Sequence, residues 1–294
     1  MKKIFILTIL LFIFKVGKTQ NESYWQSIKD WHVARYNYLK APDGWLNLEG
    51  LFWLHPGVNS FGSSSKADAH YENSNFPSIL GYFILQGDSV LWKNEVGQTI
   101  LIDKQAYKST APVTVFTTKD VNAVMDFANF SWIVIKREDK IGIRFRNYDA
   151  ALLKTFTGLN YFPTQTKWRV KAKLEKPAQD FIMISNILGQ TTAQKSAGIL
   201  HFTIDGKNYS LEATDEGKSL FIAFADLTTG ATTYGSGRFI DVEKPDATGY
   251  TYIDFNKAYN PPCAFTAFAT CPLPPKQNRL SLAILAGEKK YGHH

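Results

Sequence analysis

The sequence predicts an all-β protein, a sandwich or barrel of many short antiparallel strands with one N-terminal helix. Two observations carry this prediction. From residue 80 onward, short segments of alternating apolar and polar residues are separated by turn pairs such as Gly87-Asp88 and Asp205-Gly206. Only one segment, residues 23–40, strongly repeats its apolar residues at helical spacing. Many short strands with a single strong helix are typical of sandwiches and barrels.

Residues 23–40 carry this helical pattern. Ser23 and Gln26 have the spacing of a capping box, in which side chains satisfy free backbone N–H groups at the start of a helix. An apolar bias marks the residues that recur at helical spacing, which are Tyr24, Ile28, Trp31, Arg35 and Leu39. We therefore expect this helix to pack across a sheet.

The strands are expected to follow in order. Residues 41–64 are interpreted as a turn, a buried strand and a second turn, because turn pairs flank a dense apolar run. Glu49 and His55 lie here, and a strand-end glutamate and a turn histidine in water are preferred over two pocket residues. We expect hairpins at 81–92 and 131–146, and further strands at 169–175, 181–185, 199–213, 220–226, 233–242, 251–256 and 280–286.

The first 19 residues have the form of a secretory signal peptide. Two lysines precede an apolar run from Ile4 to Phe14, and small or polar residues follow. That run is shorter than the roughly 18 apolar residues that a spanning helix needs, and no later segment reaches this length. We expect cleavage before Gln20, and a mature protein that is periplasmic or secreted and has no membrane contact.

Composition and charge argue against several classes of protein. The chain has 294 residues, 45% hydrophobic and 20% charged, as in ordinary globular proteins. The formal net charge is +7, but four lysines lie in the leader, so the mature chain carries +3. Charges of both signs are mixed, without a basic stripe interleaved with aromatic residues, and we expect no nucleic-acid partner. No complete cofactor motif is present, and we expect no cofactor.

The mature chain is expected to be one continuous globular unit in two portions. Residues 20–146 form the helix and a β-rich portion, and residues 147–294 form a C-terminal β portion. The segment 147–166 lacks clean alternation, so it is the best candidate for a boundary inside the chain.

Cys263 and Cys271 are predicted to form a disulfide. They are the two cysteines of the chain, separated by seven residues, and an oxidising compartment favours their bonding. In the chain-entropy model, closing so small a loop stabilises a protein by about 2 to 3 kcal/mol. A nucleophilic Cys263 served by His55 or His201 is the competing interpretation and has no local support. A zinc site would need two more ligands at a suitable spacing, so we expect no metal.

The segment from Tyr252 to Glu288 is the most unusual of the chain. It contains both cysteines and five of the twelve prolines, which fix φ and remove backbone donors. We expect a long, stiff loop with strand only at its ends, and long ordered loops are usually functional. If 251–256 is a strand, Asp254 and Asn256 share a polar face, with Arg238 as a natural neighbour across a hairpin. An Arg–Asp pair of this kind more often fixes a loop than takes part in catalysis.

The chain resembles a known family in four stretches. DGWLNLEGLFWLHPGVNSFG lies near the start and RFRNYDAALLKTFTGLNYFPTQTKWRVKAKLE in the middle; GKSLFIAFADLTTGATTYGSGRFIDV and YIDFNKAYNPPCAFTAFATCPLPPKQNRLSLAILAGEK follow towards the end. These stretches are similar to the bacterial and archaeal family catalogued as domain of unknown function 1684, and the NPPCAF and CPLPP pieces are its most specific motifs. The resemblance covers most of the mature chain. It supports the choice of site and implies no chemistry.

The candidate ligand-binding residues are polar side chains in and beside this segment, namely Arg238, Asp254, Asn256, Tyr259, Asn260 and Glu288. Amides, a phenol, an arginine and carboxylates suit a small polar molecule, such as a sugar or another hydroxyl- or carboxylate-bearing compound. Two alternatives stay open. In the first alternative, Asp254 and Glu288 are the acid and base of a hydrolase. In the second, the loop has a purely structural role. No catalytic motif is complete, so the catalytic residues are unknown and the question of enzyme activity stays open.

Overall fold

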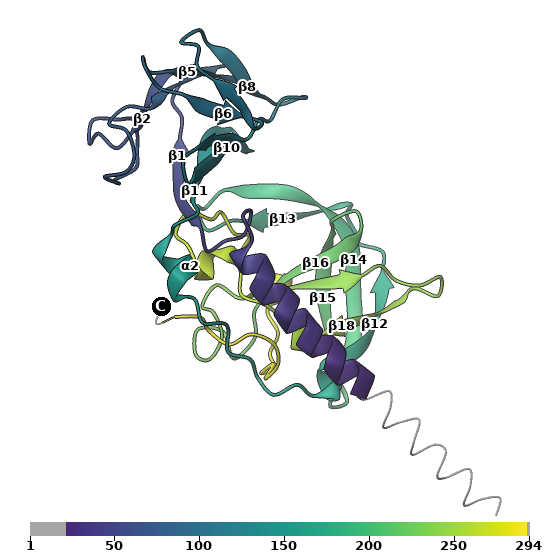
Figure 1. Cartoon of the computed structure of the whole chain (residues 1–294). Coiled ribbons are helices and arrows are strands. Elements are labelled where there is room, and N and C mark those ends of the chain that lie inside the picture. Colours follow the sequence, from purple (N-terminus) through teal and green to yellow (C-terminus); the bar gives the residue numbers. More distant parts are fainter. Residues whose placement is uncertain (1–21, 293–294) are drawn as a thin grey trace, which may run out of the picture. The chain divides into compact units, whose positions relative to one another are not determined.

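The computed structural model describes residues 22–292, which form two compact units (Figure 1). Unit 1 contains the described residues up to 39, residues 158–264, and those from 271 onward; unit 2 contains residues 40–157 and 265–270. The predicted leader, 1–19, lies outside the described residues. A compact unit need not fold independently, so the proposed division after residue 146 stays a prediction. No described helix is long and apolar enough to cross a membrane.

Unit 2 contains two sheets around an aromatic core. The six-stranded sheet has the order β1 (Leu48–Trp53), β11 (Lys140–Asn147), β10 (Phe130–Arg137), β9 (Met125–Phe127), β6 (Ile100–Ile102) and β7 (Gln105–Tyr107). The five-stranded sheet has the order β3 (Ala69–His70), β2 (Gly57–Gly62), β4 (Gly81–Gln86), β5 (Ser89–Asn94) and β8 (Val113–Thr117). Phe61 lies at the centre of the core, and its ring contacts those of Phe83, Trp92, Trp132 and Phe145.

Unit 1 is built on one strongly curved sheet. Its order is β17 (Arg238–Glu243), β16 (Ser219–Phe224), β15 (Lys207–Asp215), β14 (Thr191–Ile204), β12 (Arg169–Glu175) and β18 (Tyr250–Asp254), and β13 (Phe181–Ser185) pairs with the other part of β14. The edge strands β17 and β18 are joined by a short connection, and Thr251 Oγ1 donates to Glu243 O at 2.8 Å. The sheet therefore curls towards a barrel around a buried apolar core.

The N-terminal helix covers residues 22–40 in the described part of the chain (Figure 1). Ile28, Arg35 and Leu39 are buried at the spacing that the sequence predicts for its packing face. Trp31 packs edge-on against Tyr161, with ring centroids 6.4 Å apart. The helix is thus held in unit 1 through its predicted face.

The predicted fold class, all-β with one N-terminal helix, is confirmed. Both predicted hairpins are present and turn where expected, between Gln86 and Ser89 and between Arg137 and Lys140. Four predictions about strands were wrong. Residues 280–286 form no strand, β17 begins only at Arg238, and β18 ends at Asp254. The second turn predicted within residues 41–64 contains strand β2 (Gly57–Gly62). The boundary segment 147–166 contains one short helix, α2 (Ala151–Thr155), and passes from unit 2 into unit 1.

Candidate ligand-binding site

Residues 252–288 form an ordered, irregular segment. After β18 ends at Asp254, the chain makes single turns of 3-10 helix at η2 (Phe255–Lys257), η3 (Pro262–Ala264) and η4 (Lys276–Asn278). The predicted disulfide between Cys263 and Cys271 is present, with Cα atoms 6.2 Å apart. The prediction of a loop with strand at both ends holds only at the first end, because no strand follows η4 among the described residues.

Asp254 and Asn256 fasten the start of this segment to the N-terminal helix. Tyr24 donates its hydroxyl to Asp254, at 2.9 Å from Oδ1 and 3.0 Å from Oδ2. Asn256 Nδ2 donates to Tyr24 Oη at 2.8 Å and to Gln165 O at 2.9 Å. Burial and the neighbouring Asp254 carboxylate raise the pKa of Tyr24, which therefore stays a donor. Asn256 lies in η2, so the strand face predicted to be shared by Asp254 and Asn256 was wrong.

Glu288 and Asn260 form a second buried group with Arg35. Arg35 Nε lies 2.8 Å from Glu288 Oε1, and Asn260 N donates to Glu288 Oε2 at 2.6 Å. Arg35 also donates to Asn260 O, at 2.8 Å. Glu288 and Asn260 are completely buried. Burial raises the pKa of Glu288, and the Arg35 guanidinium opposes that rise.

Arg238 is paired differently from the prediction. Its Nη2 lies 2.7 Å from Asp226 Oδ2, so Asp226 is its ion-pair partner and the predicted neighbour Asp254 is not. Strand β17 pairs with β16, which places Arg238 opposite Phe224. The guanidinium also donates to the backbone carbonyls of Ile284 and Ala286. Arg238 therefore holds the end of the loop segment.

Tyr259 is the most accessible of the six predicted residues. Its hydroxyl donates to Asp241 Oδ2 at 3.0 Å, and the Arg35 guanidinium lies over its ring at 4.6 Å from the centroid. Burial and the Asp241 carboxylate raise the pKa of Tyr259. Arg35 thus contacts both the Tyr259 ring and the Glu288 carboxylate, and it links these two residues to the helix.

The structure brings all six predicted residues into unit 1 and gives each a partner inside the fold. Five of them are at most 9% exposed. Their partners on the helix, Tyr24 and Arg35, were not predicted, because they lie more than 220 residues away in the sequence. The observed bonds fix the loop and the helix. The ligand-binding role of the six residues stays a prediction.

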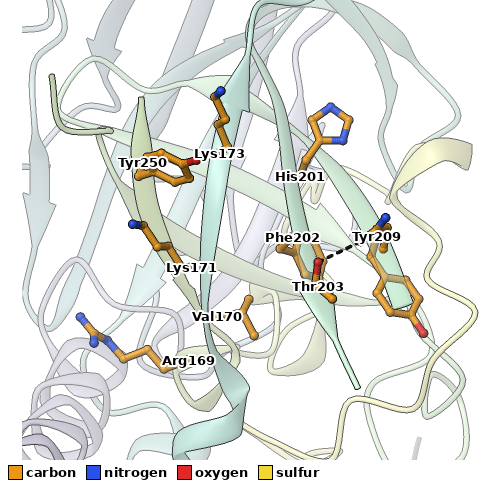
Figure 2. A pocket seen from close by; sticks show the side chains of 10 residues that line it. Arg169, Val170, Lys171, Lys173, His201, Phe202, Thr203, Tyr209 and Tyr250 are labelled. Carbon is orange, nitrogen blue, oxygen red and sulfur yellow. Dashed lines mark hydrogen bonds between the residues drawn. The ribbon is translucent and has the colours of Figure 1, made fainter. Parts of the chain in front are cut away.

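An open groove of about 630 Å³ lies on the outer face of the same sheet (Figure 2). Strand β12 supplies Arg169, Lys171 and Lys173, which follow one another along the groove, whereas Val170 and Ala172 between them are buried in the core. The other strands supply polar and aromatic lining residues, which are His201, Phe202, Thr203, Asn208, Tyr209 and Tyr250. The cationic side of the groove is the solvent face of a strand with strict alternation, and the core residues Val170 and Phe202 also line the groove.

The three cations of β12 are arranged over tyrosine rings of β18. The Arg169 guanidinium lies 4.0 Å from the centroid of the Tyr252 ring, and Lys171 Nζ lies 4.1 Å from that of Tyr250. Lys173 Nζ lies 5.8 Å from the Tyr250 centroid. Within residues 22–292, none of the three cations makes an ion pair. The three cations therefore lie outside ion-pair distance of the described carboxylates, although the Thr248 hydrogen bond and the Lys171 charge both lower the pKa of Asp246 and Arg169 is the cross-strand partner of Asp254.

The opposite side of the groove carries polar side chains, with the Glu175 carboxylate beside them. His201 lies next to Lys173 in the sheet, and its Nε2 is 3.0 Å from Glu175 Oε2. Thr203 Oγ1 donates to Asn208 Oδ1 at 2.9 Å (Figure 2). These groups offer both donors and acceptors to a ligand.

The groove was not predicted from the sequence, although the cationic strand that forms one side of it can be recognised from consecutive residues. The alternation in Arg169-Val170-Lys171-Ala172-Lys173 marks a strand with one cationic face. Its aromatic partners, Tyr250 and Tyr252, come from a strand that follows about 80 residues later. No basic and aromatic stripe exists along the sequence, as stated above, but sheet pairing assembles a short one.

Comparisons with known proteins give a family and no activity. A solution NMR structure of an uncharacterized protein of Haloarcula marismortui is 32% identical, with 46% of this chain and 78% of that chain covered, at a TM-score of 0.39. A crystal structure of Rad53 1-466 in complex with AMP-PNP is 10% identical, with 75% and 49% covered, and its TM-score of 0.19 carries no argument. No curated protein matches. Residues 154–289 match the model of the family described as "Protein of unknown function (DUF1684)", and the chain belongs to this family.

Proposed function

We propose that this is an exported protein that binds a small anionic ligand carrying hydroxyl groups in the groove on β12, β14, β15 and β18. The observation that supports this proposal is the row of Arg169, Lys171 and Lys173, ordered by tyrosine rings and without ion pairs. The proposal keeps the ligand class predicted from the sequence, a small polar molecule. It adds the requirement for negative charge and moves the site from the six predicted residues to the groove.

The tyrosine rings position the cations without cancelling their charge. A ring attracts a cation through its quadrupole and has no net charge, whereas a carboxylate partner would neutralise it. Side chains on one face of a strand stand roughly 7 Å apart, so one carboxylate or phosphate group fits between Lys171 and either neighbour. Charge-assisted hydrogen bonds of this kind are stronger than neutral ones. The row therefore favours an acid group over a neutral one.

The remaining lining residues suit the hydroxyl groups of such a ligand. Tyr250, Thr203 and Asn208 each combine a donor and an acceptor. None of the residues that line the groove is a carboxylate, and the Glu175 carboxylate beside it is held 3.0 Å from His201 Nε2. The ligand class that fits is a sugar acid, a sugar phosphate or another hydroxy acid.

The groove borders the predicted segment, because β18 supplies Tyr250 and Tyr252. We propose that the six predicted residues act on binding indirectly, since Asp254 and its partners hold the end of β18 in place. No observation favours the hydrolase alternative. Asp254 and Glu288 belong to separate hydrogen-bonded groups, the first with Tyr24 and the second with Arg35.

Export is the second part of the proposal. The leader has the form of a signal peptide, and a disulfide between Cys263 and Cys271 suits an oxidising compartment such as the periplasm. N-terminal sequencing of protein from native cells is expected to begin at or near Gln20. An intact Met1 on most of the protein would contradict export with cleavage.

Calorimetric titration tests the binding proposal with glucuronate and glucose 6-phosphate, and with glucose as the neutral analogue. We expect one or both acids to bind and glucose not to compete. Lys171→Gln and Arg169→Gln should each weaken binding about tenfold, the equivalent of one lost charge-assisted bond. Lys218→Gln, on the exposed turn between β15 and β16, is the control and should bind normally. Acid binding that is equal in all variants would refute the groove as the site.

A further inference from the structure

Unit 2 contains a second pocket, which differs from the groove in chemistry. Its volume is about 470 Å³, and four asparagines line it, namely Asn73, Asn75, Asn129 and Asn147. Asp149 and Lys154 also line it, and Lys154 Nζ lies 3.9 Å from Asp149 Oδ1. These two side chains have opposite charges that offset each other. The rest of the polar lining consists of neutral amides.

Backbone hydrogen bonds fix the segments that carry these amides. The turn between β9 and β10 contains Asn129, and its carbonyl accepts from Tyr148 N at 2.8 Å. In the same turn Ala128 has a φ of 50°, a conformation that residues other than glycine rarely adopt. Such backbone strain is concentrated at functional positions. The turn that carries Asn129 is therefore bonded to Tyr148, which lies between Asn147 and Asp149 of the same pocket.

Asn147 forms the buried base of the pocket. Its Nδ2 donates to Glu49 Oε2 at 2.9 Å and lies 3.1 Å from Tyr71 Oη, while Tyr71 donates to the same Glu49 oxygen. Burial and the bond to Glu49 raise the pKa of Tyr71 to about 12, so its hydroxyl stays protonated. Glu49, which was predicted to lie at a strand end or to face a pocket, thus orients the side-chain amide of Asn147 at the base of this pocket.

The amides nearer the solvent keep free hydrogen-bonding groups. In the part of the chain that the structure describes, the side-chain amide of Asn75 makes no hydrogen bond, and neither does Asn129 Oδ1. Asn129 Nδ2 is used, because it donates to Asp149. An amide offers a donor and an acceptor together, as a sugar hydroxyl does, and carries no charge.

We propose that this pocket binds a neutral saccharide through the amides of Asn75 and Asn129, with Asn147 at its base. An uncharged polyol matches amides better than an acid does, because Asp149 and Lys154 leave no net charge to attract one. The pocket is a site separate from the groove of unit 1, and its occupancy does not depend on the anionic ligand.

Saturation-transfer NMR tests this proposal with glucose, galactose, mannose and N-acetylglucosamine, each at about 10 mM, a concentration suited to weak binding. At least one sugar should receive saturation from the full chain, and Asn75→Ala/Asn129→Ala should reduce that signal about fivefold or more. Asn122→Ala, an exposed asparagine of the same unit outside this pocket, and Lys171→Gln in the groove should leave the signal unchanged.

The single variant Asn75→Ala separates a loss of sugar binding from a folding defect of the double variant. Its side chain makes no bond within the described chain, so its melting temperature should equal that of the native protein while its sugar signal falls. A signal that survives in both variants, or no sugar signal from the folded native protein, would overturn the proposal.

Discussion

Arg35 of the N-terminal helix and Glu288 near the C-terminus form an ion pair of 2.8 Å whose side chains are 7% and 0% exposed. They are 253 residues apart in the sequence. A buried pair of this kind contributes little net stability compared with apolar residues, but breaking it leaves a buried charge without its partner. The pair therefore makes the position of the helix depend on the end of the chain.

The first prediction concerns Glu288→Gln, which keeps the size of the side chain and removes its charge. The free energy of unfolding should fall by about 3 to 5 kcal/mol, because the Arg35 guanidinium stays buried without a carboxylate. Urea unfolding followed by circular dichroism measures this change. Glu243→Gln, at an exposed position of β17, is the matched control and should change stability by no more than about 0.5 kcal/mol. Equal stabilities of the two variants would show that the pair is not buried in solution.

The second prediction concerns the disulfide. In oxidising buffer, Cys263→Ser/Cys271→Ser should lower the free energy of unfolding by about 2 to 3 kcal/mol, because the unfolded chain loses the constraint of a closed loop. Treatment of the native protein with a reductant should produce the same loss, and the variant should not respond to reductant. If the reductant also destabilised the variant, the loss of stability in the native protein would not come from the Cys263–Cys271 disulfide.

The hairpins were predictable because their information is local. Gly87-Asp88 supplies the turn and the flanking residues alternate, so β4 and β5 follow from about fourteen consecutive residues. Strands β6, β7 and β9 have three residues each, too few to show a period, and no strand was assigned to them from the sequence.

The apolar run 280–286 fails as a strand for a tertiary reason. Leu280 and Leu282 bond to the backbone of residues 225 and 227, but beyond them the carbonyls of Ile284 and Ala286 accept hydrogen bonds from the buried Arg238 side chain instead of from a neighbouring strand. In the candidate site, residue type and setting identified Asp254 and Glu288 as unusual. Their partners Tyr24 and Arg35 lie on a helix at the other end of the chain, and only the folded structure brings these residues together.

The third prediction is a pH dependence in unit 2. Ser60 donates hydrogen bonds to Asp68 Oδ2 from its hydroxyl at 2.6 Å and its backbone N–H at 2.8 Å, and these bonds lower the pKa of Asp68 to about 2. A depressed carboxyl pKa stabilises the fold above the ordinary value near 4, and this contribution is lost as the pH falls towards 2. Carboxyl-detected NMR should find Asp68 still ionised at about pH 3. In Ser60→Ala its midpoint should move up towards the ordinary value, and an unchanged midpoint would contradict the assignment.

The last prediction separates a structural Asp254 from a ligand-binding one. Asp254→Asn keeps the shape of the side chain but weakens the acceptor of the Tyr24 hydroxyl, which is bonded at 2.9 and 3.0 Å. If the carboxylate holds the helix, this change should lower the free energy of unfolding by about 1.5 to 3 kcal/mol, the usual contribution of a hydrogen bond to a charged group. A carboxylate reserved for a ligand would leave melting nearly unchanged, because functional groups are seldom placed for stability.

A double-mutant cycle with Tyr24→Phe assigns that loss to the bond itself. The two changes remove the same interaction, so their combined effect should be smaller than the sum of the single effects by about 1 kcal/mol or more. Tyr148→Phe, at a tyrosine that is 39% exposed in unit 2, is the control and should add independently to Asp254→Asn. Full additivity between Tyr24→Phe and Asp254→Asn would mean that the hydroxyl and the carboxylate are not coupled, and Asp254 would then be free to serve the predicted ligand.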